Sequence, residues 1–224
     1  DSIERVLKSV YGRSLEAKRQ RQNRRRKWRR RRTKTNTLRD RKFIEMRPKI
    51  VGNRGRVGDA EADFIVSSKD GKGNILTFAD RKLRISFLEK ILPVSIQNVH
   101  RGFLRIQRRY PELRTITTDN DVLLLHHKEL EKLLDVKIYF CHPYHSWEKG
   151  TIENINGEIR KDIPKGSDIS RYSRRFIRSI ETKLNNRYMA LLRYATPREA
   201  LHSYRRKTKN ALMRAKKKRG KCSD

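Results

Sequence analysis

The chain has 224 residues, of which 58 are lysine or arginine and only 25 are aspartate or glutamate, so its formal net charge is +33. This length suits one domain with attachments, and a charge of this size favours a polyanionic partner, with nucleic acid first. No apolar run reaches the ~18 residues of a membrane span and no secretory signal opens the chain, while two distant cysteines exclude a disulfide scaffold or a zinc ribbon.

The positive charge is concentrated at the two ends of the chain. The first 60 residues carry a net charge of +16 and the last 24 carry +9, which leaves +8 for the 140 residues between them. The apolar periodicity also lies in the middle. We therefore expect a folded domain over 58–205, with a basic arm over 1–57 and a basic tail over 206–224.

The N-terminal arm begins with an apolar pattern and continues into a dense basic run. Apolar residues recur at helical spacing over 3–10, and a chain that opens with Asp1 instead of Met indicates a fragment. From Lys18 to Arg32, 11 of 15 residues are basic. This predicts salt-dependent binding to DNA or RNA, and a solvated linker or targeting tag is the alternative. The candidate nucleic-acid contacts in the run are Arg24, Arg25, Arg26, Lys27, Arg29, Arg30, Arg31 and Arg32.

The middle part alternates short apolar runs with turns and longer helical patterns. Three short strands joined by tight connections are expected first, and they predict an antiparallel meander. Alternating helices and strands follow, with prolines at several helix boundaries. The expected strands are 62–66, 75–78, 83–88, 113–118 and 136–140, and the expected helices are 95–110, 124–134, 151–161, 170–189 and one that opens at Pro197.

This order of elements predicts an α/β fold of the ribonuclease-H-like type. Three antiparallel strands followed by alternating helices and strands give a mixed five-stranded sheet covered by helices. In such a topology the first and fourth strands are neighbours, and the helix after the fifth strand packs across their end.

Three carboxylates occupy special places in this arrangement. Asp63 lies inside the first apolar strand, Asp119 ends the fourth strand, and Glu153 lies near the start of the helix after the fifth strand. Converging carboxylates repel one another unless a cation removes the cost, and Mg²⁺ prefers such oxygen ligands. Two Mg²⁺ ions ~3.5–4 Å apart support phosphodiester cleavage and transfer. Taken singly, each acid has a structural alternative: a turn cap, a favourable helix N-terminus or an exposed strand edge.

Several segments resemble one known family. The stretch Tyr139–Gly157, continued through Arg160 and 164–166, resembles the signature of the insertion-sequence-thirty family of bacterial transposases. Asp119 and Glu153 are separated by 33 residues, close to the spacing of such integrase cores. The resemblance covers about 58–205. It also includes the segments 58–63, 80–82, 118–120, 184–187 and 196–197. The opening Ser2–Tyr11 is similar to the last helix of the family's upstream DNA-binding helix-turn-helix region, so the resemblance implies that 1–57 is the remnant of a DNA-binding helix followed by a basic linker.

The resemblance implies an integrase catalytic core with Asp63, Asp119 and Glu153 as catalytic residues and metal ligands. It implies Mg²⁺ as cofactor, with two ions and with Mn²⁺ as a substitute. The implied activity is cleavage at the ends of an insertion sequence and joining of the freed 3′-hydroxyl to target DNA. Double-stranded DNA is then the partner, in the bacterial cytoplasm at the nucleoid, with no membrane partner. Because two DNA ends must be held together, we expect a homo-oligomer on DNA.

Further residues are candidates for supporting roles. Asn156 and Arg160 share a helical face with Glu153 and are candidate contacts to the DNA backbone, with plain solvent exposure as the alternative. Lys149 is a candidate phosphate contact. Asn120 is expected to orient Asp119, and Asn154 is a further supporting candidate. We expect no zinc site between the histidines of 126–145 and Cys141.

The chain also departs from the family pattern and leaves two other functions open. Ala60 and Ala62 replace a usual tryptophan and glycine, Asp121 replaces a glycine, and Tyr188 replaces a proline. Asp121 would add negative charge near the metal site. The first alternative is therefore a weakened or inactive DNA-binding remnant that acts as a regulator. An RNA-binding protein is the second, but it explains the charge without explaining the three placed acids.

Overall fold

The computed structural model describes residues 41–143 and 145–220, so the basic run of the N-terminal arm lies outside the described residues. The described helices and strands belong to one structural unit, Lys42–Asp224. At its centre is a five-stranded sheet of order β3-β2-β1-β4-β5. β1 pairs antiparallel with β2, which pairs antiparallel with β3, whereas β4 is parallel to both β1 and β5. The expected mixed sheet is confirmed. Its strands are β1 (Asp59–Val66), β2 (Asn74–Asp80), β3 (Ser86–Ile91), β4 (Thr115–Thr118) and β5 (Lys137–Phe140).

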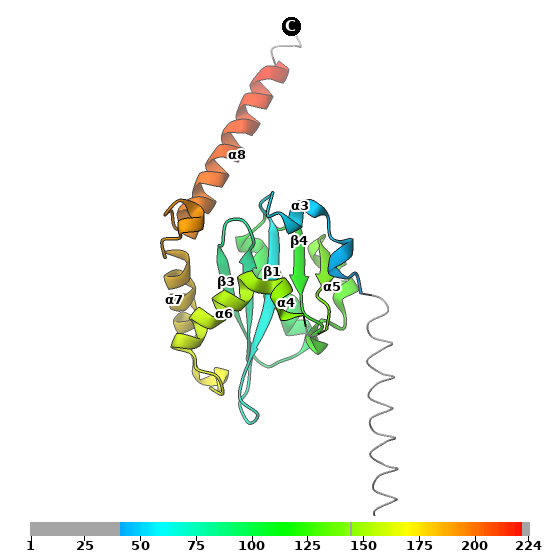
Figure 1. The fold of residues 1–224 in the computed structure, drawn as a ribbon, viewed down its shortest axis with the longest axis vertical. Coiled ribbons are helices and arrows are strands. Elements are labelled where there is room, and N and C mark those ends of the chain that lie inside the picture. Colours follow the sequence, from blue (N-terminus) through cyan, green and yellow to red (C-terminus); the bar gives the residue numbers. More distant parts are fainter. Residues whose placement is uncertain (1–40, 144, 221–224) are drawn as a thin grey trace, which may run out of the picture. The chain divides into compact units, whose positions relative to one another are not determined.

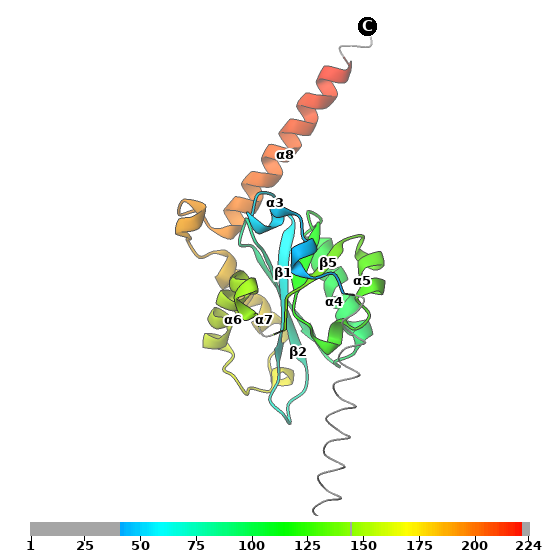
Figure 2. The same ribbon diagram turned by 45° about the vertical axis from the view of Figure 1, so that its right-hand side comes forward.

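Helices cover both faces of the sheet (Figures 1 and 2). α4 (Ile96–Arg109) and α5 (His127–Leu134) pack on one face, and α6 (Gly150–Asp162) and α7 (Arg174–Asn185) pack on the other. No helix among the described residues is long and apolar enough to cross a membrane. The remaining helices are η1 (Ile44–Met46), α3 (Lys49–Gly52), η2 (Val122–Leu124), η3 (Ser146–Lys149), η4 (Ile169–Arg171), η5 (Ala190–Leu192) and α8 (Pro197–Gly220).

The alternation of side chains along β1 separates an apolar face from an acidic one. Successive residues of a strand point to opposite faces of the sheet. Ala60, Ala62 and Phe64 join the core beneath α4 and α5, while Ile65 joins the second core beneath α6 and α7. The carboxylates at positions 59, 61 and 63 have the same parity as Ile65. All three acids of β1 therefore lie on the face that α6 and α7 cover.

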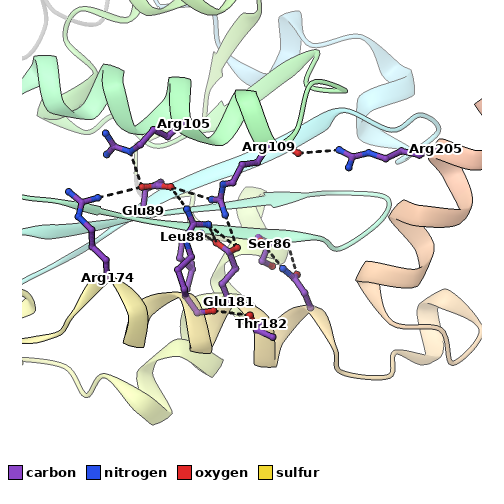
Figure 3. A network of polar contacts seen from close by, with 11 residues as sticks. Ser86, Leu88, Glu89, Arg105, Arg109, Arg174, Glu181, Thr182 and Arg205 are labelled. Atoms are coloured by element: carbon purple, nitrogen blue, oxygen red, sulfur yellow. Dashed lines mark hydrogen bonds and ion pairs between the residues drawn. The ribbon is translucent and has the colours of Figure 1, made fainter.

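The exposed edge of the sheet at β3 is closed by side chains of α7. The main-chain amide of Leu88 donates to Glu181 Oε2 at 2.6 Å. The main-chain amide and carbonyl of Ser86 both bond the side-chain amide of Asn185, each at 2.8 Å (Figure 3). Unpaired edge groups invite pairing with another chain, so these contacts protect the edge. Asn185 belongs to one of the segments that resemble the family, and edge protection gives it a physical role.

Several element boundaries differ from the expected ones because side chains shape the connections. The third strand begins at Ser86 instead of residue 83, since Asp80 accepts the main-chain amides of Lys82 and Leu83 and holds a turn there. The helix expected from residue 124 begins at His127 and follows η2. The helix expected over 170–189 is α7 alone, with Ser173 as its N-terminal cap.

Both flanks of the expected domain continue as ordered structure. The segment 42–57, which we assigned to the arm, contains η1 and α3 and forms a bridge between Phe43 and Phe140 of β5. Its Val51 is fully buried. At the other end, Leu201 of α8 joins the core and Arg205 pairs with Glu112 at 2.7 Å, and α8 continues past residue 205 to Gly220.

Candidate active site

The pairing of β1 with β4 places two aspartates side by side. In the parallel register Glu61 lies opposite Thr117 and Ala62 opposite Thr118. Asp63 follows Ala62 in β1 and Asp119 follows Thr118 at the end of β4, so the register brings the two aspartates together. Neighbouring strands are about 4.8 Å apart and aligned residues point to the same face. The expectation that the first and fourth strands are neighbours is confirmed.

The ammonium group of Lys149 lies between these two aspartates. Its Nζ is 3.3 Å from Asp63 Oδ1 and 3.0 Å from Asp119 Oδ2. The lysine side chain is only 5% exposed, whereas the side chains of Asp63 and Asp119 are 29% and 51% exposed. Burial alone would lower the pKa of Lys149, but the charges of Asp63 and Asp119 raise it above its usual value. One buried cation thus serves two carboxylates that face solvent.

Helix α6 adds a second contact to the pair of aspartates. The side-chain amide of Asn156 donates to Asp63 Oδ2 at 2.9 Å. Residues three apart on a helix share a face, so Glu153 lies one turn before Asn156 on the side of α6 that faces Asp63. Glu153 is exposed. The structure therefore brings Asp63, Asp119, Lys149 and Asn156 into direct contact, while Glu153 is exposed one helical turn before Asn156.

A buried carboxylate on β1 fixes the start of α6. Glu61 Oε2 accepts the main-chain amide of Ile152 at 2.9 Å, and Glu61 Oε1 pairs with Arg81 at 2.6 Å. A carboxylate at a helix N-terminus is favourable because it accepts amides that lack a partner within the helix. Glu61 thereby sets the position of the helix that carries Glu153 and Asn156.

Acids on the same face of β1 differ sharply in how their charge is compensated. Asp59 is buried and its two oxygens accept from Arg56, one of them also from Thr115. Glu61 is buried against Arg81, as described above. Asp63 is partly exposed and shares its cation with Asp119. Of the three acids on β1, Asp63 is the one with an incompletely compensated charge and access to solvent.

Several candidate residues have contacts other than the expected ones. Lys149, expected to touch phosphate, is buried against the two aspartates, and Asn156, expected at the DNA backbone, binds Asp63. Asn120 donates to the main-chain carbonyl of Cys141 at 2.6 Å. Asp121 accepts the amide of Leu123 at 2.8 Å and caps η2.

The other candidates lie elsewhere on α6 or outside the described part of the chain. Asn154 is exposed. Arg160 is partly exposed and reaches the main-chain carbonyl of Pro164 at 3.3 Å. The basic candidates of the arm, Arg24, Arg25, Arg26, Lys27, Arg29, Arg30, Arg31 and Arg32, fall outside the described residues.

The loop before α6 gathers two histidines around one acid. His142 and His145 each approach Glu148 Oε1, at 3.1 and 3.4 Å, and His142 Nε2 lies 2.7 Å from Glu45. The potential metal-ligand atoms of His142, His145 and Glu148 lie within 4.8 Å of one another. Cys141 is not part of this group: it is buried, and burial raises the pKa of its thiol to about 12.

The donor set at the two aspartates suits a hard divalent cation. Asp63, Asp119 and Glu153 offer carboxylate oxygens, the ligands that Mg²⁺ prefers, and all three retain solvent access through which a hydrated ion could enter. A cation already lies between Asp63 and Asp119 in the form of Lys149. The residues present therefore fit a divalent metal, and Asp63, Asp119 and Glu153 are the side chains that could hold it.

Sequence reasoning missed the roles of Lys149, Asn156 and Glu61. In a chain with 58 basic residues a single lysine carries little information. Glu61 gave a usable signal, because it lies at the same parity as Asp63 in an apolar strand and so required a buried partner. Asn156 donates to Asp63, a contact that the sequence did not predict, and its proposed contact with DNA stays a prediction.

No protein-family model matches the chain. A transposase for insertion sequence element IS4351 from Bacteroides fragilis is 43% identical over 157 residues, which cover 70% of this chain and 48% of the relative. The transposase InsI for insertion sequence element IS30A from Escherichia coli K12 is 31% identical over 160 residues, covering 70% of this chain and 41% of the relative. The chain thus spans less than half the length of these two relatives.

Solved structures agree with the sheet order described above. The catalytic core domain of BIV integrase superposes with a TM-score of 0.53 at 16% sequence identity, covering 67% of this chain and 98% of that domain. A chain of the simian T-cell lymphotropic virus intasome superposes with a TM-score of 0.54 at 14% identity, covering 64% of this chain and 54% of that one. The fold is therefore that of an integrase core, which is ribonuclease-H-like.

Proposed function

We propose that this chain, which belongs to the insertion-sequence-thirty family of transposases, contains the catalytic core that cleaves and joins DNA strands during transposition of an insertion sequence. The observation that carries the proposal is the pair Asp63 and Asp119, held together on adjacent strands, partly exposed, and sharing one cation. The relatives are named as transposases for insertion sequence elements, which supports the same reaction class.

In this proposal Asp63, Asp119 and Glu153 hold two Mg²⁺ ions, with Mn²⁺ as a substitute. When bound, such ions activate the attacking oxygen and stabilise the leaving oxygen of an in-line displacement at phosphorus. The attacking group is a DNA 3′-hydroxyl, or water in the cleavage step; a new P–O bond forms as the old one breaks and its 3′-oxygen leaves. No side chain forms a covalent bond with DNA, and the acids serve only as oxygen ligands of the metal ions.

The chain's other residues prepare this arrangement. Asn156 holds Asp63 through its second oxygen, which limits rotation of the carboxylate. Glu61 fixes the start of α6 and with it the position of Glu153. Asn120 ties the segment after β4 to Cys141 and so restrains the chain beside Asp119. These residues do not touch the reacting atoms, so we assign them positioning roles.

Double-stranded DNA, as transposon ends and as target, is the proposed partner. The basic run of the N-terminal arm, with Arg24–Lys27 and Arg29–Arg32, would contact phosphates and make binding strongly salt-dependent. Arg160, on the same face of α6 as Asn156, is a further proposed contact to the DNA backbone. Because both ends of the element must be held at once, we propose a homo-oligomer on DNA that acts at the bacterial nucleoid.

The test is strand cleavage and joining on supercoiled plasmid with Mg²⁺ and then Mn²⁺. The chain is compared with Glu153→Gln, which removes one proposed ligand, and with Glu158→Gln, a matched change on α6 at an acid that pairs with Lys161 and Arg187. We expect metal-dependent nicking that Glu153→Gln abolishes and Glu158→Gln retains. Equal nicking by Glu153→Gln and the unchanged chain would contradict the proposal. Intact DNA binding without nicking would instead leave a DNA-binding remnant.

A further inference from the structure

The position of Lys149 is unusual for a lysine in so basic a chain. Its side chain is 5% exposed although most lysines keep their ammonium in water, and it pairs with both aspartates of the candidate site. Taking an ammonium out of water is costly and needs close partners. Asp63 and Asp119 supply these partners. The lysine therefore lies where its positive charge offsets the repulsion between the two carboxylates.

The same two carboxylates are the ones that the proposed function assigns to a divalent metal. A divalent ion held by Asp63 and Asp119 would compete for the carboxylates that Lys149 now contacts at Asp63 Oδ1 and Asp119 Oδ2. Two cations at such short range repel each other severely. Metal binding and the present position of Lys149 therefore oppose each other.

We propose that Lys149 is an internal counter-ion that holds Asp63 and Asp119 together before metal binding and is displaced when a divalent cation enters. This inference rests on the proposed function, since it assigns the metal to the same acids. Lys149 competes with the metal for the two carboxylates and thereby weakens metal binding by the DNA-free protein.

The surroundings of Lys149 permit this displacement. The lysine stem has four rotatable carbons, so the ammonium can move several ångströms without movement of the backbone. Asp119 is half exposed, so solvent adjoins the ion pair. Gly150, the next residue and the first of α6, is exposed, so solvent adjoins the chain there as well. Once released, the ammonium lies beside the site and can bind a DNA phosphate, the contact that the sequence predicted.

The first experiment measures Mn²⁺ binding to the full chain by titration calorimetry at low ionic strength without DNA. Lys149→Met removes the charge but keeps an unbranched side chain, and Lys149→Arg keeps the charge. Lys90→Met is the matched control, because Lys90 is a partly buried lysine that bonds the main-chain carbonyls of Ser170 and Tyr172. Asp119→Asn identifies which binding belongs to the site.

We expect Lys149→Met to bind Mn²⁺ on the order of tenfold more tightly, since one opposing charge is removed from contact with the ligands. Lys149→Arg and Lys90→Met should bind as the unchanged chain does. Suppose that the unchanged chain binds Mn²⁺ and that Asp119→Asn abolishes this binding. Equal or weaker Mn²⁺ binding by Lys149→Met would then overturn this inference and leave the proposed metal site intact. If neither the unchanged chain nor Lys149→Met shows binding that depends on Asp119, both this inference and the proposed metal site are wrong.

A second measurement does not depend on the stability of Lys149→Met. In the ¹⁵N-lysine-labelled chain, the ammonium resonance of Lys149 is assigned by its loss in Lys149→Arg. We expect the paired ammonium to be protected from exchange without metal, and its resonance to shift or broaden as Mg²⁺ saturates the site. A resonance that stays unchanged at saturating Mg²⁺ would show that lysine and metal occupy different places, and would overturn the proposal.

Discussion

Two groups of acids, one at the β3 edge of the sheet and one between its inner strands β1 and β4, differ in the number of cations for each carboxylate. At β3 and α7, Glu89 and Glu181 lie among Arg105, Arg109 and Arg174 (Figure 3). Arg178 pairs with both acids as well. The side chains of Glu89 and Glu181 are only 4% and 12% exposed. At the candidate site, Asp63 and Asp119 share Lys149 and are 29% and 51% exposed.

The difference separates acids that stabilise the fold from acids that are available for chemistry. Glu89 has four arginine partners that compensate its charge inside the protein, so it needs no further ligand. Glu181 has two arginine partners, and burial raises its pKa to about 7, so its environment also favours a structural role. Carboxylates that share one lysine and face solvent keep negative charge that an incoming cation can use. Both groups occur in a chain of net charge +33, so the local ratio and not the overall charge identifies the site.

The largest expected effect is the loss of activity in Asp119→Asn, with only a small loss of stability. Removing a metal ligand should reduce strand cleavage on the order of a thousandfold, because a bound metal supplies several kcal/mol of transition-state stabilisation. Asp119 is half exposed but is one of the two partners of the buried Lys149, so the free energy of unfolding should fall by about 1 kcal/mol, less than for a fully buried pair. Plasmid nicking and urea denaturation measure the two quantities. A large destabilisation would place Asp119 with the structural acids.

The reverse pattern is expected for Glu89→Gln. Glu89 is buried among arginines, and its neutralisation leaves their charges uncompensated at the edge of the sheet. We expect the free energy of unfolding to fall by about 3 kcal/mol, the lower end of the range for breaking a buried pair, because the arginines are partly exposed. Metal-dependent nicking per folded molecule should be unchanged. Urea denaturation followed by activity at low temperature checks both, and unchanged stability would contradict the argument.

The sequence predicted the sheet and the neighbourhood of Asp63 and Asp119 because both follow from local patterns and topology. Strand alternation placed Asp63 in β1, the end of an apolar run placed Asp119, and the order of elements made their strands adjacent, as the register confirms. The role of Glu153 as a metal ligand stays a prediction. Its helical face is supported by the contact of Asn156 with Asp63.

What the sequence did not predict depends on pairing between distant side chains. Nothing in the local sequence distinguishes Lys149 from other lysines until the fold buries it against Asp63 and Asp119. The segment 42–57 was hidden for a similar reason, because its basic composition resembles the arm while Val51 and Phe43 pack on the domain. In both cases high charge masked a few residues whose surroundings decide their role.

A smaller effect is expected from the side chain that closes the edge at β3. Asn185→Ala removes both bonds to the main chain of Ser86 and leaves a buried amide and carbonyl without partners. This should cost about 2 kcal/mol of unfolding free energy. The control is Asn186→Ala at the next position, which is exposed and should have little effect. If the two variants have equal stability, edge closure by Asn185 is not the reason for its place in the family-like segment.

The smallest effect concerns a third group of acids, Glu148 and Glu45, whose cation is the protonated ring of His142. This ring loses its positive charge when the pH rises. His142 lies between Glu148 and Glu45, at 3.1 and 2.7 Å, and stacks on Phe43 at 5.3 Å. The hydrogen bond to Glu148, together with the charge of Glu45, raises the pKa of His142 above its usual value of about 6.5. A group whose pKa is raised by folding stabilises the protein fully below its unfolded pKa. That contribution is lost as pH rises through the folded pKa.

We therefore expect the stability of the unchanged chain to fall as pH rises above about 6.5, and expect His142→Gln to show a flatter pH dependence over the same range. Urea denaturation at a series of pH values measures the slope. Glu148→Gln tests the cause, because removing the first acid should lower the pKa of His142 in an NMR titration of its ring. Equal slopes in the unchanged chain and His142→Gln would assign the pH dependence to other groups. In that case the pairing of His142 with Glu148 and Glu45 would not depend on pH in this range. It would then resemble the pairing of Lys149 with Asp63 and Asp119, in which we propose that only another cation displaces the lysine.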